Sequence, residues 1–130
     1  MTLFVCVDDR MGMAFFGRRQ SRDSAVCKDI AATAGGQTIG MAHASAKLFD
    51  GIDARLAPGA DPKTCGFYFL EFAPPSTLIG PGDTLVLYRW NRHYAADLHF
   101  DIPLEGKLPA DVREFAGTSH ETITREVYKL

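Results

Sequence analysis

The chain has 130 residues, of which 46% are hydrophobic and 23% are charged, a composition typical of one compact domain with a buried core. Its formal net charge is −2 at pH 7, so no strong field attracts the chain to nucleic acid or to an anionic membrane surface. Neither a signal-peptide pattern nor the roughly 18 consecutive apolar residues of a membrane span occur, so we expect one cytoplasmic domain, residues 1–130, with no membrane partner.

An apolar strand is predicted at the start of the chain. Residues 3–7 are apolar without interruption, which is the pattern of a strand buried on both faces, and we expect it to be central in its sheet. Residues 8–20 follow with two glycines, adjacent phenylalanines and an arginine pair. They are predicted to form a loop with an apolar middle, and loops of this kind commonly cover a site.

A helix is predicted over residues 24–34, where apolar residues recur at every fourth position. Ser21 or Asp23 opens this helix, and the glycines at positions 35 and 36 end it. Residues 38–41 are predicted to form the next strand, joined to the first by a right-handed parallel crossover. A short second helix is expected over residues 45–49.

The middle of the chain alternates surface connections with apolar strands. Residues 50–64 lack a strong period and are predicted to be a surface connection. Residues 65–72 and 84–90 are predicted strands, and the three prolines in residues 73–83 exclude a crossover helix between them. Residues 97–102 alternate apolar and polar side chains, which indicates a half-exposed strand with antiparallel pairing.

The last segment carries two conflicting patterns. Thr118 followed by Glu121 resembles a helix capping box. Residues 122–128, however, are rich in residues that prefer β-structure. We predict a strand over residues 122–128.

Cysteine and histidine usage argues against disulfides and against a metal centre. The cysteines are odd in number, widely spaced and partly within apolar stretches, which is typical of reduced thiols in a cytosolic protein. The histidines show no paired ligand spacing, so no metal and no zinc-dependent nuclease are predicted. These residues are Cys6, Cys27 and Cys65, and His43, His93, His99 and His120.

Several short strings occur in an order that suggests a family. Residues 3–13 are a strand followed by Asp8 and Arg-Met-Gly-Met, and residues 20–23 are Gln-Ser-Arg-Asp at a helix start. Residues 38–45 read Thr-Ile-Gly-Met-Ala-His-Ala-Ser, and residues 97–100 read Asp-Leu-His-Phe. With the Ser-His pair that opens residues 119–128, this order resembles the dihydrofolate reductase family in shortened form.

The resemblance implies an α/β fold with three layers, in which a mixed, mostly parallel central sheet is flanked by helices. The segment between Gly59 and Cys65 is too short for a separate adenosine-binding part. The resemblance also implies an oxidoreductase in which NADPH donates hydride to a pterin-like heterocycle. Strand ends and helix starts would meet at the ligand site, as in other open α/β sheets.

The resemblance assigns roles to particular residues. Asp23 would be the catalytic acid that holds the heterocycle and helps deliver a proton, with Val5 and Met13 beside it in the substrate pocket. His43 and Ser45 would contact cofactor phosphates. The alternative for Asp23 is a helix-start charge stabilised by the helix dipole, and for His43 and Ser45 a capped helix with an exposed imidazole.

The departures from the family concern the cofactor. Glu71 and Phe72 replace the double glycine that lets a pyrophosphate approach the backbone, and Ala42 replaces a further glycine. Glu71 adds a negative charge where a phosphate would lie, and like charges in a partly desolvated site repel. We therefore predict that NADPH binds weakly or not at all.

Three arginines beside the first helix indicate a second kind of function. Arg18, Arg19 and Arg22 could hold a phosphate or a carboxylate, as arginine forks and free helix-start amides favour; solvated loop charges are the alternative. Two functions therefore stay open, a reductase of a heterocycle and a non-catalytic domain that binds a nucleotide, a phosphate or an RNA end. A homo-oligomer is compatible with both.

Two further patterns carry less weight. Tyr88 and Trp90 flank Arg89 and could stack on nucleic-acid bases, although core packing at a strand end explains them better. The string Ser119-His120-Glu121 is contiguous, so these three side chains do not converge as a hydrolytic triad would.

Overall fold

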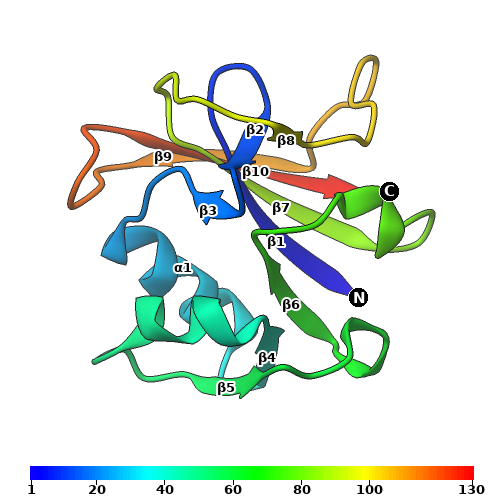
Figure 1. Cartoon of the computed structure of the whole chain (residues 1–130). Coiled ribbons are helices and arrows are strands. Elements are labelled where there is room, and N and C mark those ends of the chain that lie inside the picture. Colours follow the sequence, from blue (N-terminus) through cyan, green and yellow to red (C-terminus); the bar gives the residue numbers. More distant parts are fainter.

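The computed structural model describes residues 1–130 and contains a mixed seven-stranded sheet with a small three-stranded sheet beside it (Figure 1). The main sheet has the order β5 (Arg55–Pro58), β4 (Thr38–Met41), β6 (Phe67–Leu70), β1 (Thr2–Val7), β7 (Thr84–Arg89), β10 (Ile123–Lys129) and β9 (Asp111–Phe115). The first five strands are parallel, whereas β10 pairs antiparallel with β7 and with β9. This confirms the α/β class and a mixed, mostly parallel sheet.

Strand β1 lies at the centre of the sheet, between β6 and β7, as its apolar sequence predicted. Side chains alternate along it, so Phe4 packs in one core cluster and Val5 in another. Both side chains are fully buried. The main sheet therefore has apolar layers on both faces.

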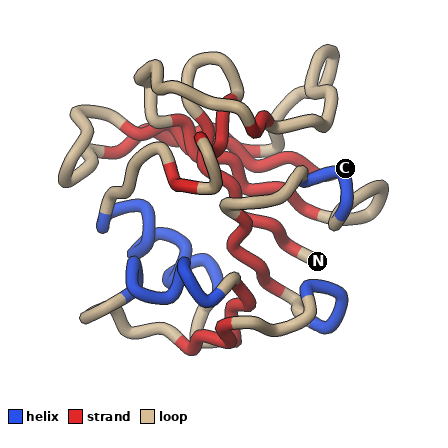
Figure 2. The backbone as a smooth tube through the Cα atoms, in the orientation of Figure 1, coloured by secondary structure: helices blue, strands red, loops and turns tan.

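One face of the sheet is covered by α1 (Ser24–Ala34) and by the 3-10 helix η1 (His43–Phe49) (Figure 2). The bounds of α1 agree with the prediction; Asp23 is its N-cap, and Gly35 has the left-handed φ of 60° that ends such helices. Asp29 of α1 accepts hydrogen bonds from Tyr88 of β7 and from Arg125 of β10. The expected short second helix is a 3-10 helix that begins two residues earlier.

The other face corrects the expectation that helices flank the sheet on both sides. It is covered by loops, by η3 (Pro75–Thr77) and by the small sheet of β3 (Arg18–Arg19), β2 (Gly12–Phe15) and β8 (Leu98–His99). Met13, Ile79 and Phe100 supply its buried apolar side chains. Prolines in residues 73–83 leave too few backbone donors there for a longer helix.

Several segments differ in detail from the sequence predictions. Residues 8–20 form the hairpin of β2 and β3 rather than a loop, and the surface connection contains β5 and the 3-10 helix η2 (Pro62–Thr64). The expected strand over residues 97–102 is reduced to β8, although its pairing with β2 is antiparallel. The strand predicted over residues 122–128 is β10, which spans Ile123–Lys129, so that prediction is confirmed. None of the helices is long and apolar enough to cross a membrane.

Candidate functional site

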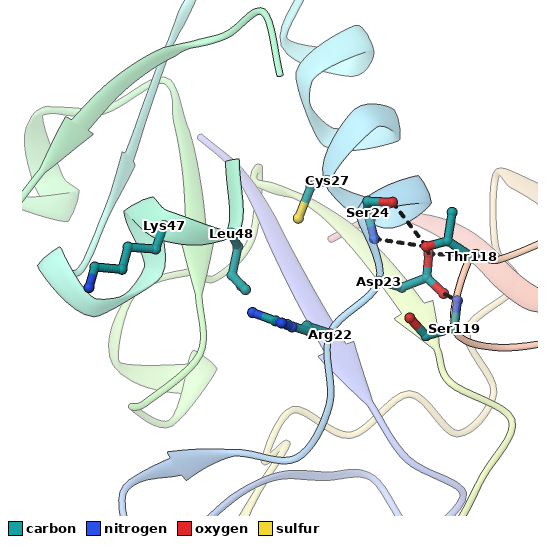
Figure 3. Close-up of a pocket in the computed structure, with 8 residues that line it drawn as sticks. All are labelled: Arg22, Asp23, Ser24, Cys27, Lys47, Leu48, Thr118 and Ser119. Atoms are coloured by element: carbon teal, nitrogen blue, oxygen red, sulfur yellow. Dashed lines mark hydrogen bonds between the residues drawn. The ribbon is translucent and has the colours of Figure 1, made fainter. Parts of the chain in front are cut away.

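A cavity of about 230 Å³ opens at the start of α1 (Figure 3). Its walls come from the first turn of α1, from η1 and from the loop that precedes β10. Arg22, Ser24 and Cys27 line one side, and Lys47 and Leu48 of η1 line another. The remaining lining residues are Asp23, Thr118 and Ser119. Three segments distant in sequence therefore meet at the place where an open α/β sheet is expected to bind its ligand.

Asp23 is buried at the edge of this cavity, with 2% of its surface exposed. Its carboxylate accepts hydrogen bonds from the backbone N–H groups of Ala25 (2.9 Å), Thr118 (2.9 Å) and Ser119 (2.8 Å). The Thr118 hydroxyl (2.8 Å) and His120 Nδ1 (3.0 Å) also contact it. One carboxylate thus joins the start of α1 to the loop before β10.

Two opposing effects act on the pKa of Asp23. Burial raises it, but the hydrogen bonds from Thr118, His120 and Ser119 favour the charged form more strongly and hold the pKa well below its usual range. Asp23 therefore stays ionised near neutral pH. A carboxylate in this state orients its donors and is a poor source of a proton.

The three arginines have different environments. Arg22 is exposed, forms no ion pair, and extends across the cavity toward η1 in Figure 3. Arg18 is exposed at the end of the β2–β3 hairpin and also forms no ion pair. Arg19 instead donates to both carboxylate oxygens of Glu71, at 2.9 Å each, and to the carbonyl oxygen of Ala44 at 2.8 Å. Of the three, Arg22 is the one placed at the cavity.

Of the two positions that the resemblance assigns to cofactor phosphates, Ser45 is engaged within the protein and His43 is exposed. Ser45 is fully buried, and its hydroxyl donates to Glu71 at 2.6 Å. Glu71 therefore receives hydrogen bonds from both Ser45 and Arg19. His43 is exposed at the start of η1 and lies against Gly59, whose φ of 79° suits glycine.

Val5 and Met13 do not lie beside Asp23, which corrects the predicted pocket. Val5 is fully buried on the face of the sheet opposite α1, because neighbouring residues of a strand point to opposite faces. Met13 packs in the same cluster as Val5 and borders a separate small cavity that Ser21 also lines. The cavity at Asp23 is bounded by η1 and the loop before β10 instead.

Four residues that the sequence did not assign to this site form a cluster beside Asp23. His120 is buried behind Asp23, and its Nε2 atom is 3.1 Å from Ser21 Oγ and 3.0 Å from the Tyr94 hydroxyl. Trp90 stacks on the imidazole, with ring centres 4.7 Å apart. Ser21 and Tyr94 are 99 and 26 residues from His120 in sequence, so no local sequence pattern predicts that these side chains meet.

No known family model matches the chain, and a search of curated proteins finds no relative. The structure contains no group of three or more His, Cys, Asp or Glu side chains that could hold a metal ion. Cys6, Cys27 and Cys65 are free thiols. Burial raises the pKa of the Cys27 thiol to about 12, so this cavity-lining sulfur is a weak nucleophile.

Proposed function

We propose that this domain binds a small anionic ligand, through a phosphate or carboxylate group, in the cavity at the start of α1. The observation that carries the proposal is Arg22, whose guanidinium extends across that cavity with no acidic partner. A guanidinium fork matches the geometry of phosphate and carboxylate oxygens. The Ser119 hydroxyl supplies a neutral donor on the cavity wall, whereas the Thr118 hydroxyl donates to Asp23 and the Ser24 hydroxyl bonds to Thr118.

The charge at this cavity favours an anion despite the presence of Asp23. Among its lining residues Arg22 and Lys47 each carry +1 and Asp23 carries −1, which leaves +1. Lys47 is exposed and points away from the cavity in Figure 3, so it contributes to the surrounding field rather than to a contact. The start of α1 adds the positive end of the helix dipole.

The size of the cavity narrows the ligand class. At about 230 Å³ it is smaller than the roughly 300–1,000 Å³ of typical cofactor and drug sites. A phosphate, a phosphorylated fragment or a short carboxylate fits these dimensions, and a dinucleotide does not. The ligand that we propose is therefore small, with any nucleoside part held outside the cavity.

Binding of an RNA end is less well supported than binding of a small molecule. Trp90 is 4% exposed and is stacked on His120, and Tyr88 is fully buried. Arg89, which lies between them, forms an ion pair with Glu126 at 3.0 Å. Base stacking needs an exposed aromatic face, and this strand end presents none.

We propose that the resemblance to dihydrofolate reductase reflects common ancestry, which the order of strands and helices supports, and not a shared activity. Two observations weigh against hydride transfer from NADPH. Ser45 is engaged by Glu71, and the pKa of Asp23 is lowered rather than tuned toward neutrality. An NAD(P)H-dependent reductase of a pterin-like heterocycle is the second candidate function.

Thermal unfolding in the presence of ligands tests the two candidates. We expect inorganic phosphate to raise the melting temperature with increasing concentration, because a ligand that binds only the native state stabilises it by mass action. Arg22→Ala should weaken phosphate binding about tenfold or more, equivalent to about 1.4 kcal/mol. Arg10→Ala, an exposed arginine outside this cavity, is the control and should bind as the unmodified chain does.

The opposite pattern of shifts would reject the proposal. A melting temperature raised by NADPH or dihydrofolate and unchanged by phosphate would select the reductase. Equal phosphate binding by the Arg22→Ala and Arg10→Ala variants would mean that Arg22 does not bind the phosphate.

A further inference from the structure

A linear array of hydrogen-bonded side chains lies behind the cavity. Ser21 Oγ is 3.1 Å from His120 Nε2, and His120 Nδ1 is 3.0 Å from Asp23 Oδ2. This is the order of nucleophile, base and orienting carboxylate that serine hydrolases of unrelated folds share, and it is recognised by geometry rather than by sequence position. This array differs from the contiguous string Ser119-His120-Glu121, because Ser21 and Asp23 come from the segment before α1.

Asp23 determines which nitrogen of His120 carries the proton. A carboxylate only accepts hydrogen bonds, so the contact with Nδ1 requires a proton on that atom and leaves Nε2 as an acceptor for Ser21. The imidazole is held in this orientation by stacking on Trp90, and its side chain is 1% exposed. Water therefore cannot displace Asp23 from the imidazole.

Asp23 also matches the electrostatic requirement of an orienting carboxylate. It is fully enclosed and receives backbone and hydroxyl hydrogen bonds besides the one from His120. These bonds keep its pKa low, so the carboxylate stays charged when the neighbouring imidazole accepts a proton. The same property that makes Asp23 a poor proton donor makes it a good positioning residue.

Tyr94 completes the array on the side of Ser21. Its hydroxyl is 3.3 Å from Ser21 Oγ and 3.0 Å from His120 Nε2. The neutral Nε2 atom has one lone pair and accepts one hydrogen bond. If the Tyr94 hydroxyl donates to Ser21 Oγ and the Ser21 hydroxyl donates to Nε2, every donor in the array has an acceptor. When Ser21 forms a bond to carbon, the Tyr94 hydroxyl is free to donate to a developing oxyanion nearby.

The surroundings of Ser21 limit the size of a substrate. Ser21 is half-buried between β3 and α1, and the cavity that it lines has a volume of about 10 Å³. A cavity of this size holds about one water molecule. An acyl group at Ser21 must therefore be short, with the leaving group in solvent.

We propose that Ser21, His120 and Tyr94, with Asp23 as positioning residue, form an acyl-transfer site that hydrolyses small esters. Ser21 Oγ bonds to the carbonyl carbon while its proton moves to His120 Nε2. The ester C–O bond then breaks, and the leaving alcohol takes that proton. Water repeats the sequence on the acyl-serine, giving its proton to Nε2, from which it returns to Ser21 Oγ as the acid is released.

This proposal does not depend on anion binding by Arg22. The two are distinguishable, because one requires the Ser21 hydroxyl and the other requires the guanidinium. Loss of phosphate binding would leave ester hydrolysis intact, and the reverse also holds.

Labelling of the full chain with methanesulfonyl fluoride, a serine reagent that carries only a methyl group, tests the nucleophile. Ser21 Oγ would displace fluoride and form an S–O bond, and its proton would pass to His120. Intact mass and peptide mapping should show one adduct, located on Ser21, in the folded protein and none in the urea-denatured protein. Ser21→Ala should abolish labelling, whereas Ser76→Ala, which removes an exposed hydroxyl bonded to Asp101, should label within twofold of the unmodified chain.

Two variants test the partners of Ser21. His120→Gln should lower the rates of labelling and of p-nitrophenyl acetate hydrolysis at least 100-fold, and Tyr94→Phe, which keeps the half-buried ring, about tenfold. Tyr94→Phe decides the matter if His120→Gln does not fold. An absent adduct, an adduct on another residue, or unchanged rates in a folded variant would overturn the proposal.

The role of Asp23 has its own spectroscopic signature. ¹⁵N NMR of the imidazole in the intact protein should show His120 protonated on Nδ1 and unprotonated on Nε2 above neutral pH. A proton on Nε2 instead would mean that Asp23 does not position the imidazole for Ser21, and would overturn the array.

Discussion

At the scale of single residues, Asp23 concentrates more interactions than its place at a helix start suggested. An exposed acid at that position contributes about 1 kcal/mol or less through the helix dipole. Asp23 is buried and accepts hydrogen bonds from two segments, including three backbone N–H groups. Hydrogen bonds to a buried charge contribute more than neutral ones, and the loss of such a charge leaves donors unpaired.

Replacement of Asp23 by asparagine should therefore destabilise the fold. We expect Asp23→Asn to lower the free energy of unfolding by about 2–4 kcal/mol at pH 7, because an uncharged carboxamide cannot satisfy all of these donors. Urea denaturation measures this difference. Asp53→Asn, an exposed acid without a hydrogen-bond partner, serves as the control and should change stability by less than about 0.5 kcal/mol.

The unmodified chain and the Asp23→Asn variant should differ in the pH dependence of their stability. The pKa of Asp23 is lower in the folded state than in the unfolded chain, so its contribution is complete above the unfolded pKa of about 3.9 and is lost as the pH falls below that value. The curves for the unmodified chain and Asp23→Asn should therefore converge in acid. Curves that stay parallel from pH 6 to pH 2 would contradict this assignment.

At the scale of elements, Glu71 links the β2–β3 hairpin to η1. It follows β6, and its carboxylate is held by Arg19 of β3 and by Ser45 of η1. The side chain of Glu71 is 8% exposed. A buried carboxylate with two partners is costly to displace, because removing it leaves the Arg19 charge without its counter-ion.

This arrangement predicts how the chain responds to NADPH. We expect calorimetry to detect no tight binding by the unmodified chain, since Glu71 engages Ser45 and places negative charge where phosphates would lie. The double variant Glu71→Gly with Phe72→Gly should also fail to bind, because residues 59–65 are too short for an adenosine-binding part. A dissociation constant in the micromolar range or tighter for the unmodified chain would contradict both expectations.

At the scale of the whole molecule, the elements that the sequence predicted well are those governed by local rules. Continuous apolar sequence marked β1 as central, and Asp23 and Gly35 marked the ends of α1. At the C-terminus, β-preferring residues outweighed the capping-box pattern of Thr118 and Glu121. The Thr118 hydroxyl bonds to Asp23 and Ser24 instead of opening a helix of its own.

The features that the sequence did not predict depend on distant partners. Strand β9 is exposed over most of its length and is strand only because it pairs with β10. The hairpin of β2 and β3 turns at Phe16, whose φ of 49° is unusual for a residue other than glycine. The helix start identified Asp23, but no local signal linked it to His120, 97 residues away in sequence.

The most direct test of the central claim, an anion site at the start of α1, is a ¹H–¹⁵N NMR titration with inorganic phosphate. We predict that the largest shifts fall on the backbone amides of residues 22–25, 47–48 and 118–119, and that Arg22→Ala removes them. NADPH should produce no shifts at Ser45 or Glu71. Shifts confined to Ser45 and Glu71, or an unchanged spectrum at the start of α1 with phosphate, would contradict the account.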